Sequence, residues 1–343
     1  MKKFVFVLST LTLLTTGVIA QNKLLNLKAE TRIDYMGQYL DNVHDKGASG
    51  FKGKYLNLIL SGEIGRHFSY NYRQRLNKAH ADQSFFDATD WLYLTYSLND
   101  NWQFSAGKQV VGIGGYEYDR APIDLYFCSE FWNNIACYQF GASATFTTDS
   151  GADKIMFQVC QSPFRTYADD IYAYNLMWMG SHKWFQSLWS INMSEYQPGS
   201  YVYYIALGNQ FTFGDFRLQL DVMNRATNEH SFFFKDFSLM GEASYTIADK
   251  VNIFARATYD VNNAIGTMGD YCLLPDTELT RIGGGIEFYP LPKGNRDIRL
   301  HAAYSHIFGH NGNPEGALQS KESMFTIGLT WRMDIVSLVK KIF

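Results

Sequence analysis

The chain has 343 residues, of which 30 are Lys or Arg and 33 are Asp or Glu, so its formal net charge is only −3. A charge this small gives no reason to expect nucleic acid as a partner. Aromatic residues make up 16% of the chain and charged residues only 18%, a composition that a water-soluble protein would have difficulty burying. No apolar run after residue 20 reaches the roughly eighteen residues that a membrane-spanning helix needs. The remaining architecture that satisfies every backbone group in lipid is a closed barrel, so we expect an all-β, transmembrane antiparallel β-barrel.

The first residues have the pattern of an export signal. Lys2 and Lys3 precede an apolar run over residues 4–14, and small residues follow up to Ala20. This run is too short to span a bilayer, and no cysteine follows it to carry a lipid. We therefore expect residues 1–20 to be a signal peptide and residues 21–343 to form one barrel domain in the bacterial outer membrane.

The first strand after the signal alternates strictly between two kinds of side chain. Residues 27, 29, 31, 33 and 35 are mainly apolar, whereas Lys28, Glu30, Arg32 and Asp34 between them are charged. Such alternation is typical of a barrel strand with one face in lipid and the other in an aqueous lumen. The same period of two returns over residues 216–222, 251–260 and 298–305.

Counting every such segment predicts about sixteen strands. Their predicted centres are Thr31, Leu58, Tyr70, Leu92, Phe104, Ala142, Phe157, Leu176, Trp189, Ile205, Leu218, Gly241, Ala255, Gly284, Leu300 and Ile327. The polar alternation is weakest in the seventh to tenth of these segments. Short turns follow the even-numbered segments and longer links the odd-numbered ones, which is the sidedness of an outer-membrane barrel.

Charged residues at the alternate positions are predicted to line the lumen. These residues are Lys28, Glu30, Arg32, Asp34, Arg73, Arg75, Arg217, Asp221, Glu242, Arg256, Arg281 and Arg299. Opposed rows of arginine and acid could set a transverse field that orients polar solutes. Alternatively, the same residues could form ion pairs that stiffen a water-filled wall, which the adjacent alternation from Lys28 to Asp34 favours.

The longest connection, over residues 108–134, follows the fifth predicted strand. Its opening Gly107, Lys108 and Gln109, followed by the sequence GIGGYEYD at residues 112–119, resembles the phosphate-selective porin O and P family, and most closely the branch of that family found in Bacteroidetes. The resemblance implies a third extracellular loop that folds into the barrel and narrows it. A barrel of sixteen strands is wide enough to leave an aqueous channel that wall side chains cannot fill.

The resemblance also implies a function. We expect passive diffusion of small hydrophilic solutes or ions, with outer-membrane lipid around a possible homotrimer and no cofactor. The expected constriction residues are Lys108, Glu117, Asp119, Arg120, Asp124 and Glu130. Two positive charges against four negative ones do not form the basic filter that a preference for phosphate would require.

Other features of the sequence leave alternatives open. Cys128 and Cys137 flank one part of the loop, so in an exported protein they could form a disulfide; the alternative is that all four cysteines, with Cys160 and Cys272, are free thiols. Their spacing matches no metal motif. The glycines at residues 112–115 and 283–285 precede no predicted helix and are expected to permit close packing rather than bind phosphate.

Two further classes of protein compete with the pore. A structural or adhesive barrel would have a blocked interior, and an outer-membrane hydrolase would need a nucleophile and a base. His301 and Ser305 face the same predicted lumen, but neither belongs to a nucleophile motif. We therefore expect no enzymatic activity.

Overall fold

The computed structural model describes residues 25–78, 84–164, 170–227, 234–263, 272–292, 294–312 and 321–337. The predicted signal peptide over residues 1–20 lies outside these ranges. None of the described helices is long and apolar enough to cross a membrane.

Seventeen strands form a single sheet. In chain order they are β1 (Asn26–Leu40), β2 (Val43–His44), β3 (Gly50–Ile64), β4 (Phe68–Arg75), β5 (Thr89–Ser97), β6 (Trp102–Val110), β7 (Tyr138–Thr147), β8 (Asp153–Gln161), β9 (Tyr172–His182), β10 (Phe185–Gln197), β11 (Ser200–Phe213), β12 (Phe216–Thr227), β13 (Asp236–Ile247), β14 (Val251–Asn262), β15 (Thr277–Phe288), β16 (Ile298–His310) and β17 (Glu322–Asp334). The short helices are η1 (Phe85–Ala88), α2 (Tyr116–Asp119), η2 (Pro122–Asp124) and α3 (Glu130–Asn134).

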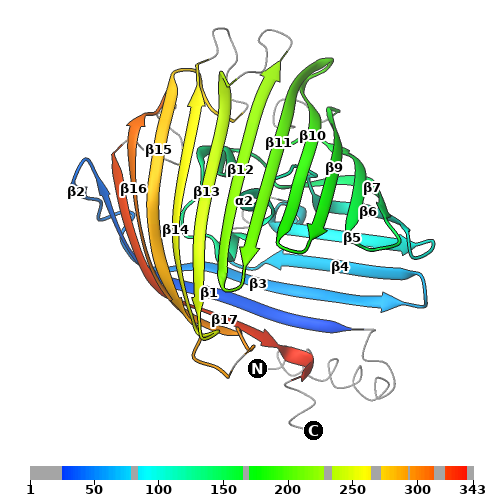
Figure 1. Ribbon diagram of the computed structural model, residues 1–343, viewed down its shortest axis with the longest axis horizontal. Coiled ribbons are helices and arrows are strands. Elements are labelled where there is room, and N and C mark those ends of the chain that lie inside the picture. Colours follow the sequence, from blue (N-terminus) through cyan, green and yellow to red (C-terminus); the bar gives the residue numbers. More distant parts are fainter. Residues whose placement is uncertain are drawn as a thin grey trace.

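The sheet closes into an antiparallel barrel because β1 pairs with both β3 and β17 (Figure 1). The two-residue strand β2 lies in the link between β1 and β3, where it pairs with the end of β1. The other sixteen strands form the wall, so the predicted strand number is confirmed. Each of the sixteen predicted centres lies in one of these strands.

The alternation seen in the sequence separates an inner from an outer face. In β1, the side chains of Arg32 and Asp34 are buried, whereas Ile33 and Tyr35 are 43% and 42% exposed. In β14, Arg256 is buried and its neighbour Ile253 is 47% exposed. Apolar side chains therefore form the outer surface of the barrel, and charged side chains point into it.

Turn lengths follow the expected sidedness, with one exception. The links after β3 and β11 are tight turns with glycine in the left-handed region, at Gly65 and Gly214. At the opposite end, β6 and β7 are joined by a long loop. However, β10 and β11 are joined at that end by only two residues, Pro198 and Gly199. Gly199 adopts a φ of 76°, which permits this tight hairpin.

The loop between β6 and β7 covers residues 111–137 and carries α2, η2 and α3 inside the barrel (Figure 1). Its residues Ile113, Tyr118 and Phe131 form a buried apolar cluster with wall residues such as Val202 and Tyr204. Apolar side chains therefore occupy inward positions of the wall where the loop packs against it. This packing accounts for the apolar inward positions of β11, whereas in β8 and β10 the inward residues that hold the loop, such as Gln158 and Asn192, are polar but uncharged.

Glycines allow this loop to approach the wall closely. A Cβ atom on Gly114 would lie 2.4 Å from the carbonyl oxygen of Leu188. A Cβ atom on Gly283, in β15, would lie 2.6 Å from the ring of Phe127, which belongs to the loop. Both positions therefore need glycine for close packing, as the sequence predicted.

All four cysteines are free thiols in the structure, so the expected disulfide between Cys128 and Cys137 is not present. The two residues have different surroundings. Cys137 packs against the apolar cluster around Tyr118, whereas Cys128 lies near Glu117 and Arg256 in the part of the loop that crosses the lumen. Burial raises the pKa of Cys128 to about 12 and that of Cys137 to about 11, so both thiols stay protonated and unreactive at neutral pH.

This arrangement predicts the number of thiols that can be labelled. Unfolding the unreduced protein in the presence of a maleimide should add four labels per chain, because all four cysteines are free. Mass spectrometry of the intact chain measures the number. Two labels before reduction and four afterwards would instead reveal a disulfide.

Candidate pore and its lining

The root of the loop is fixed to the wall by hydrogen bonds through its backbone. The amide of Gly112 donates to Gln158 Oε1 at 2.7 Å, and its carbonyl accepts from Asn192 Nδ2 at 2.7 Å. The amide of Gly114 donates to Ser190 Oγ at 2.8 Å. These contacts join the loop to β8 and β10, so its path into the lumen is set at its start.

A first cluster of charges joins the loop to β13 and β14. Arg120 lies 2.7 Å from Glu242, and Arg256 lies 2.8 Å from the same carboxylate. Arg256 also contacts Glu117 of α2 at 3.1 Å. The buried Arg256 and the partly exposed Arg120 thus share two buried carboxylates, and all four charges are compensated.

Wall carboxylates also hold the loop through its amides. The amide of Glu117 donates to Asp221 Oδ2 at 2.8 Å, and that of Glu130 donates to Asp260 Oδ2 at 2.9 Å. Glu117 in turn accepts a hydrogen bond from the amide of Ser129 at 3.0 Å. The segments before and after residues 121–128 are therefore held close together.

A second cluster lies at the far side of the loop, around Asp124. Arg299 of β16 and Arg332 of β17 each lie 2.7 Å from Asp124 Oδ1. Burial by itself would raise the pKa of Asp124, but the two guanidinium groups outweigh burial and hold the pKa below its ordinary value. Asp124 therefore remains ionised, and Arg332 extends the cluster to Glu30 at 3.3 Å.

Arg32 holds the innermost part of the loop by its backbone. Its Nη1 donates to the carbonyl oxygens of Leu125 at 2.5 Å and Ile123 at 3.2 Å. Asp34 pairs with the same guanidinium at 2.7 Å. The ring of Tyr126 covers it, with 4.6 Å between Cζ and the ring centroid. The adjacent charges Arg32 and Asp34 thus form the local ion pair that their spacing suggested.

Other predicted wall residues form no ion pair with the loop in the described ranges, although Arg281 lies over the ring of Phe127 at 6.0 Å. Arg73 and Arg75 both pair with Asp90, at 2.7 and 2.8 Å. Arg281 pairs with Glu322 at 2.9 Å. Lys28 is exposed near the end of β1. Among the loop residues, Asp119 is exposed and makes no ion pair with any residue that the structure describes.

Lys108 is not part of the loop, contrary to the prediction. Strand β6 continues to Val110, and Lys108 lies opposite Leu92 and Phe140, which are 41% and 37% exposed on the outer face. Its ammonium group donates to the carbonyl oxygen of Phe86 at 2.6 Å. The helix η1 therefore covers this lysine on the outside of the barrel, because strand alternation places residue 108 on the outer face.

The position of Lys108 gives a testable prediction. Substituting Lys108→Gln should leave the ion selectivity unchanged, because the lost charge does not face the lumen. The reversal potential in a salt gradient across a planar bilayer measures the selectivity. Arg75→Gln, which removes a charge from the inner face, is the comparison and should shift the potential. An equal shift for both variants would place Lys108 in the pore.

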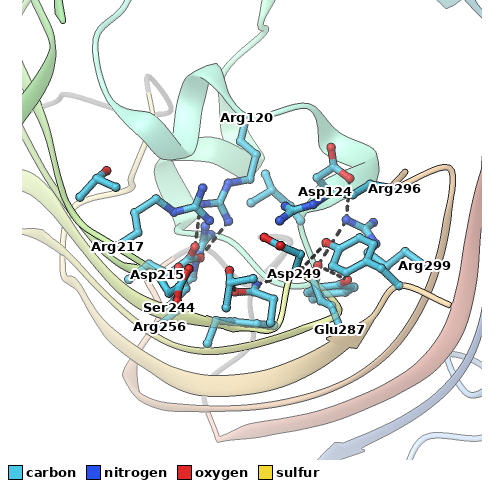
Figure 2. A pocket seen from close by; sticks show the side chains of 18 of the residues that line it. Arg120, Asp124, Asp215, Arg217, Ser244, Asp249, Arg256, Glu287, Arg296 and Arg299 are labelled. Atoms are coloured by element: carbon cyan, nitrogen blue, oxygen red, sulfur yellow. Dashed lines mark hydrogen bonds and ion pairs between the residues drawn. The ribbon is translucent and has the colours of Figure 1, made fainter. Parts of the chain in front are cut away.

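A chamber of about 680 Å³ lies between loop residues 120–127 and the barrel wall from β11 to β17. Figure 2 shows its charged lining, with Arg120 and Arg217 at one end and Arg296 and Arg299 at the other. Six arginines and five carboxylates line it: Arg120, Arg217, Arg256, Arg296, Arg299, Arg332, Asp124, Asp215, Glu242, Asp249 and Glu287. The lumen is thus not filled where the loop crosses it.

The candidate site contains residues that the sequence analysis missed. Arg332 lies opposite Glu30 in β1, so strand alternation places it inward. Arg296 lies in the link between β15 and β16 and covers the ring of Tyr289 at 4.8 Å. Tyr126 donates to Glu287 at 2.7 Å. Alternation could have identified Arg332, but no pattern in the sequence indicates that Arg296 and Tyr126 line the same space.

Comparison with known proteins agrees with this geometry. The family model described as phosphate-selective porin O and P matches residues 25–183. No curated protein matches the chain in sequence.

Solved structures match over most of the chain. The anion-selective porin from Comamonas acidovorans has a TM-score of 0.64 at 12% identity, with 90% of this chain and 99% of that chain covered. The outer membrane channel DcaP of Acinetobacter baumannii has a TM-score of 0.63 at 8% identity, covering 90% and 96%. OmpT of Vibrio cholerae has a TM-score of 0.61 at 12% identity, covering 90% and 97%. The chain therefore has the fold of an outer-membrane porin.

Proposed function

We propose that this chain is an outer-membrane porin that lets small hydrophilic solutes or ions diffuse passively through its lumen. The observation that carries the proposal is the chamber of about 680 Å³ beside a loop that crosses the barrel. Ion pairs hold that loop to two separate parts of the wall, through Glu242 of β13 and through Asp124, which pairs with Arg299 of β16. A loop held in this way narrows the passage and still leaves space for water and solute.

We assign the constriction to residues of the loop that lies inside the barrel. Glu117, Arg120, Asp124 and Glu130 form it together with the wall residues that hold them, and Asp119 is an exposed charge beside them. Passive diffusion requires no catalytic group and no cofactor, so no residue is assigned to chemistry. The charges of the chamber are mixed, and we do not extend a preference for phosphate to this chain.

Membership of the phosphate-selective porin O and P family is part of the proposal, including its Bacteroidetes branch. The match over residues 25–183 and the porin fold support it. Residues 1–20 are proposed to direct export to the bacterial outer membrane, and residues 21–343 to form a single barrel domain. The apolar outer face, with residues such as Ile253 and Tyr35 exposed, suits surrounding lipid.

A homotrimer is also proposed. One of the structurally similar proteins, OmpT of Vibrio cholerae, is described in a trimer form. Strands β4 to β8 have only eight to ten residues each, whereas β1 and β3 have fifteen. These five strands are the shortest of the wall, and this part of the outer face is the proposed contact with neighbouring subunits. Crosslinking in native membranes measures the oligomeric state, and only monomers would contradict this part of the proposal.

Liposome swelling tests the function itself. Vesicles that contain the refolded protein should swell in isotonic arabinose and more slowly in the larger sugar raffinose, because the loop limits the size of the solute. Protein-free vesicles are the control. A structural or adhesive barrel would give no swelling in either sugar, and that result would refute the proposal.

A further inference from the structure

The chamber contains guanidinium groups that its own carboxylates do not neutralise. Glu242 is shared by Arg120 and Arg256, and Asp124 is shared by Arg299 and Arg332. Arg217 is the second residue of β12 and lines the chamber. It forms no ion pair with any residue in the described ranges. Its buried Nε atom also has no hydrogen-bond partner.

Arg217 lies beside another cation. Figure 2 shows the side chains of Arg120 and Arg217 reaching toward the same end of the chamber. Arg120 already donates to both oxygens of Glu242 and to Gln219. Arg120 is already paired with Glu242 and Arg217 has no carboxylate of its own, so this end of the chamber carries a positive charge that an anion could pair with.

Aromatic side chains form a second part of the chamber lining. Tyr126 of the loop stacks on Phe254 of β14, with ring centroids 5.5 Å apart and an interplanar angle of 14°. Phe127 and Tyr289 also line the space. A few aromatic side chains among placed polar groups are compatible with a site for a small organic molecule, and a volume near 680 Å³ is within the range of such sites.

We propose that this chamber is a binding site for organic acids that combine a carboxylate with a flat apolar group. The carboxylate pairs with Arg217 next to Arg120, and the apolar group packs against the stacked pair of Tyr126 and Phe254. The proposal rests on the porin function and adds that these acids bind saturably while they pass through the pore. An inorganic anion would use only the arginines and leave the aromatic surface in water, so it should bind more weakly.

Carboxylates at the rim of the chamber limit which ligands the site accepts. Asp215 and Asp249 lie in the turns after β11 and β13 and face the same chamber. Their carboxylates should repel ligands with an acid group at each end. One acid group per ligand is therefore the best match, because it can pair with Arg217 without approaching the rim.

Blocking of single-channel current tests the site. The full-length mature chain is reconstituted in a planar bilayer in potassium chloride, and phenylacetate, acetate or inorganic phosphate is added. We expect phenylacetate to reduce the current saturably. Acetate and phosphate should each need about tenfold higher concentrations for half-maximal block, because they lack the apolar contact.

A variant of the unpaired arginine tests its role. Arg217→Gln should raise the half-blocking concentration of phenylacetate about tenfold, the loss expected for one charge-assisted hydrogen-bonded pair. Arg217→Lys should retain part of the block, which shows that the barrel is folded. Arg66→Gln, in the turn between β3 and β4, removes one charge outside the chamber and should leave the block unchanged.

The results separate this proposal from the porin function. Channel steps with no saturable block by phenylacetate would overturn the binding site and leave the pore intact. Equal block by phosphate and phenylacetate would also overturn it, because the aromatic surface would then contribute nothing. If Arg66→Gln weakened block as much as Arg217→Gln, general charge rather than the chamber would be responsible. The absence of any channel steps would refute the porin function itself.

Discussion

Replacing residues 121–128 with two glycines should raise the single-channel conductance about two- to threefold, because this segment crosses the water-filled lumen and narrows it. Ser129, just after the segment, donates to the side chain of Glu117, just before it, at 3.0 Å, so the two ends of the deletion lie near each other. The apolar cluster around Ile113 and Phe131 stays in place and keeps the loop root folded. Conductance in a planar bilayer measures the change.

The same deletion should shift selectivity toward anions. It removes Asp124, and with it the partner that Arg299 and Arg332 share. The matched control shortens the loop between β1 and β3 by replacing residues 45–48 with two glycines, and it should leave the conductance unchanged. An unchanged conductance in the first variant would mean that residues 121–128 do not form the constriction.

Substituting Glu242→Gln should lower the free energy of unfolding by about 3 kcal/mol, because it leaves the buried Arg256 and its neighbour Arg120 with an incomplete set of partners. Glu242 is 4% exposed and lies 2.7 and 2.8 Å from Arg120 and Arg256. The loop should also loosen, since Arg120 is one of its main attachments to the wall. Urea unfolding in detergent, followed by tryptophan fluorescence, measures the stability.

A carboxylate without partners provides the control for that measurement. Asp119 is exposed and forms no ion pair with the described part of the chain. Asp119→Asn should therefore change the stability by less than about 0.5 kcal/mol. Equal stabilities for wild type and Glu242→Gln would show that the cluster around Glu242 does not hold the loop.

The strands of the barrel wall could be predicted from the sequence because the alternation that marks them is a local pattern. A strand between lipid and water must alternate every two residues, so the segments around Thr31 and Ala255 show both their faces in ten residues or fewer. The same reasoning gave the number of strands. It was weakest from β8 to β11, where the inward side chains that meet the loop are apolar or polar without charge.

The candidate site was predictable only in part, because its contacts join distant parts of the chain. Arg120 and Glu242 are 122 residues apart, and Arg299 and Asp124 are 175 residues apart. Alternation indicated that Glu242 and Arg299 face inward, but it did not indicate their partners. The loop boundary was wrong by three residues at its start, which placed the outward-facing Lys108 in the pore.

Single-channel recording tests the central claim most directly. The purified, refolded chain is added to a planar lipid bilayer in potassium chloride, with a voltage applied across the membrane. A water-filled barrel narrowed by a loop predicts discrete current steps of uniform size that increase in proportion to the salt concentration. A correctly folded chain that inserts into the bilayer and gives no current steps would contradict the claim that this barrel is a pore.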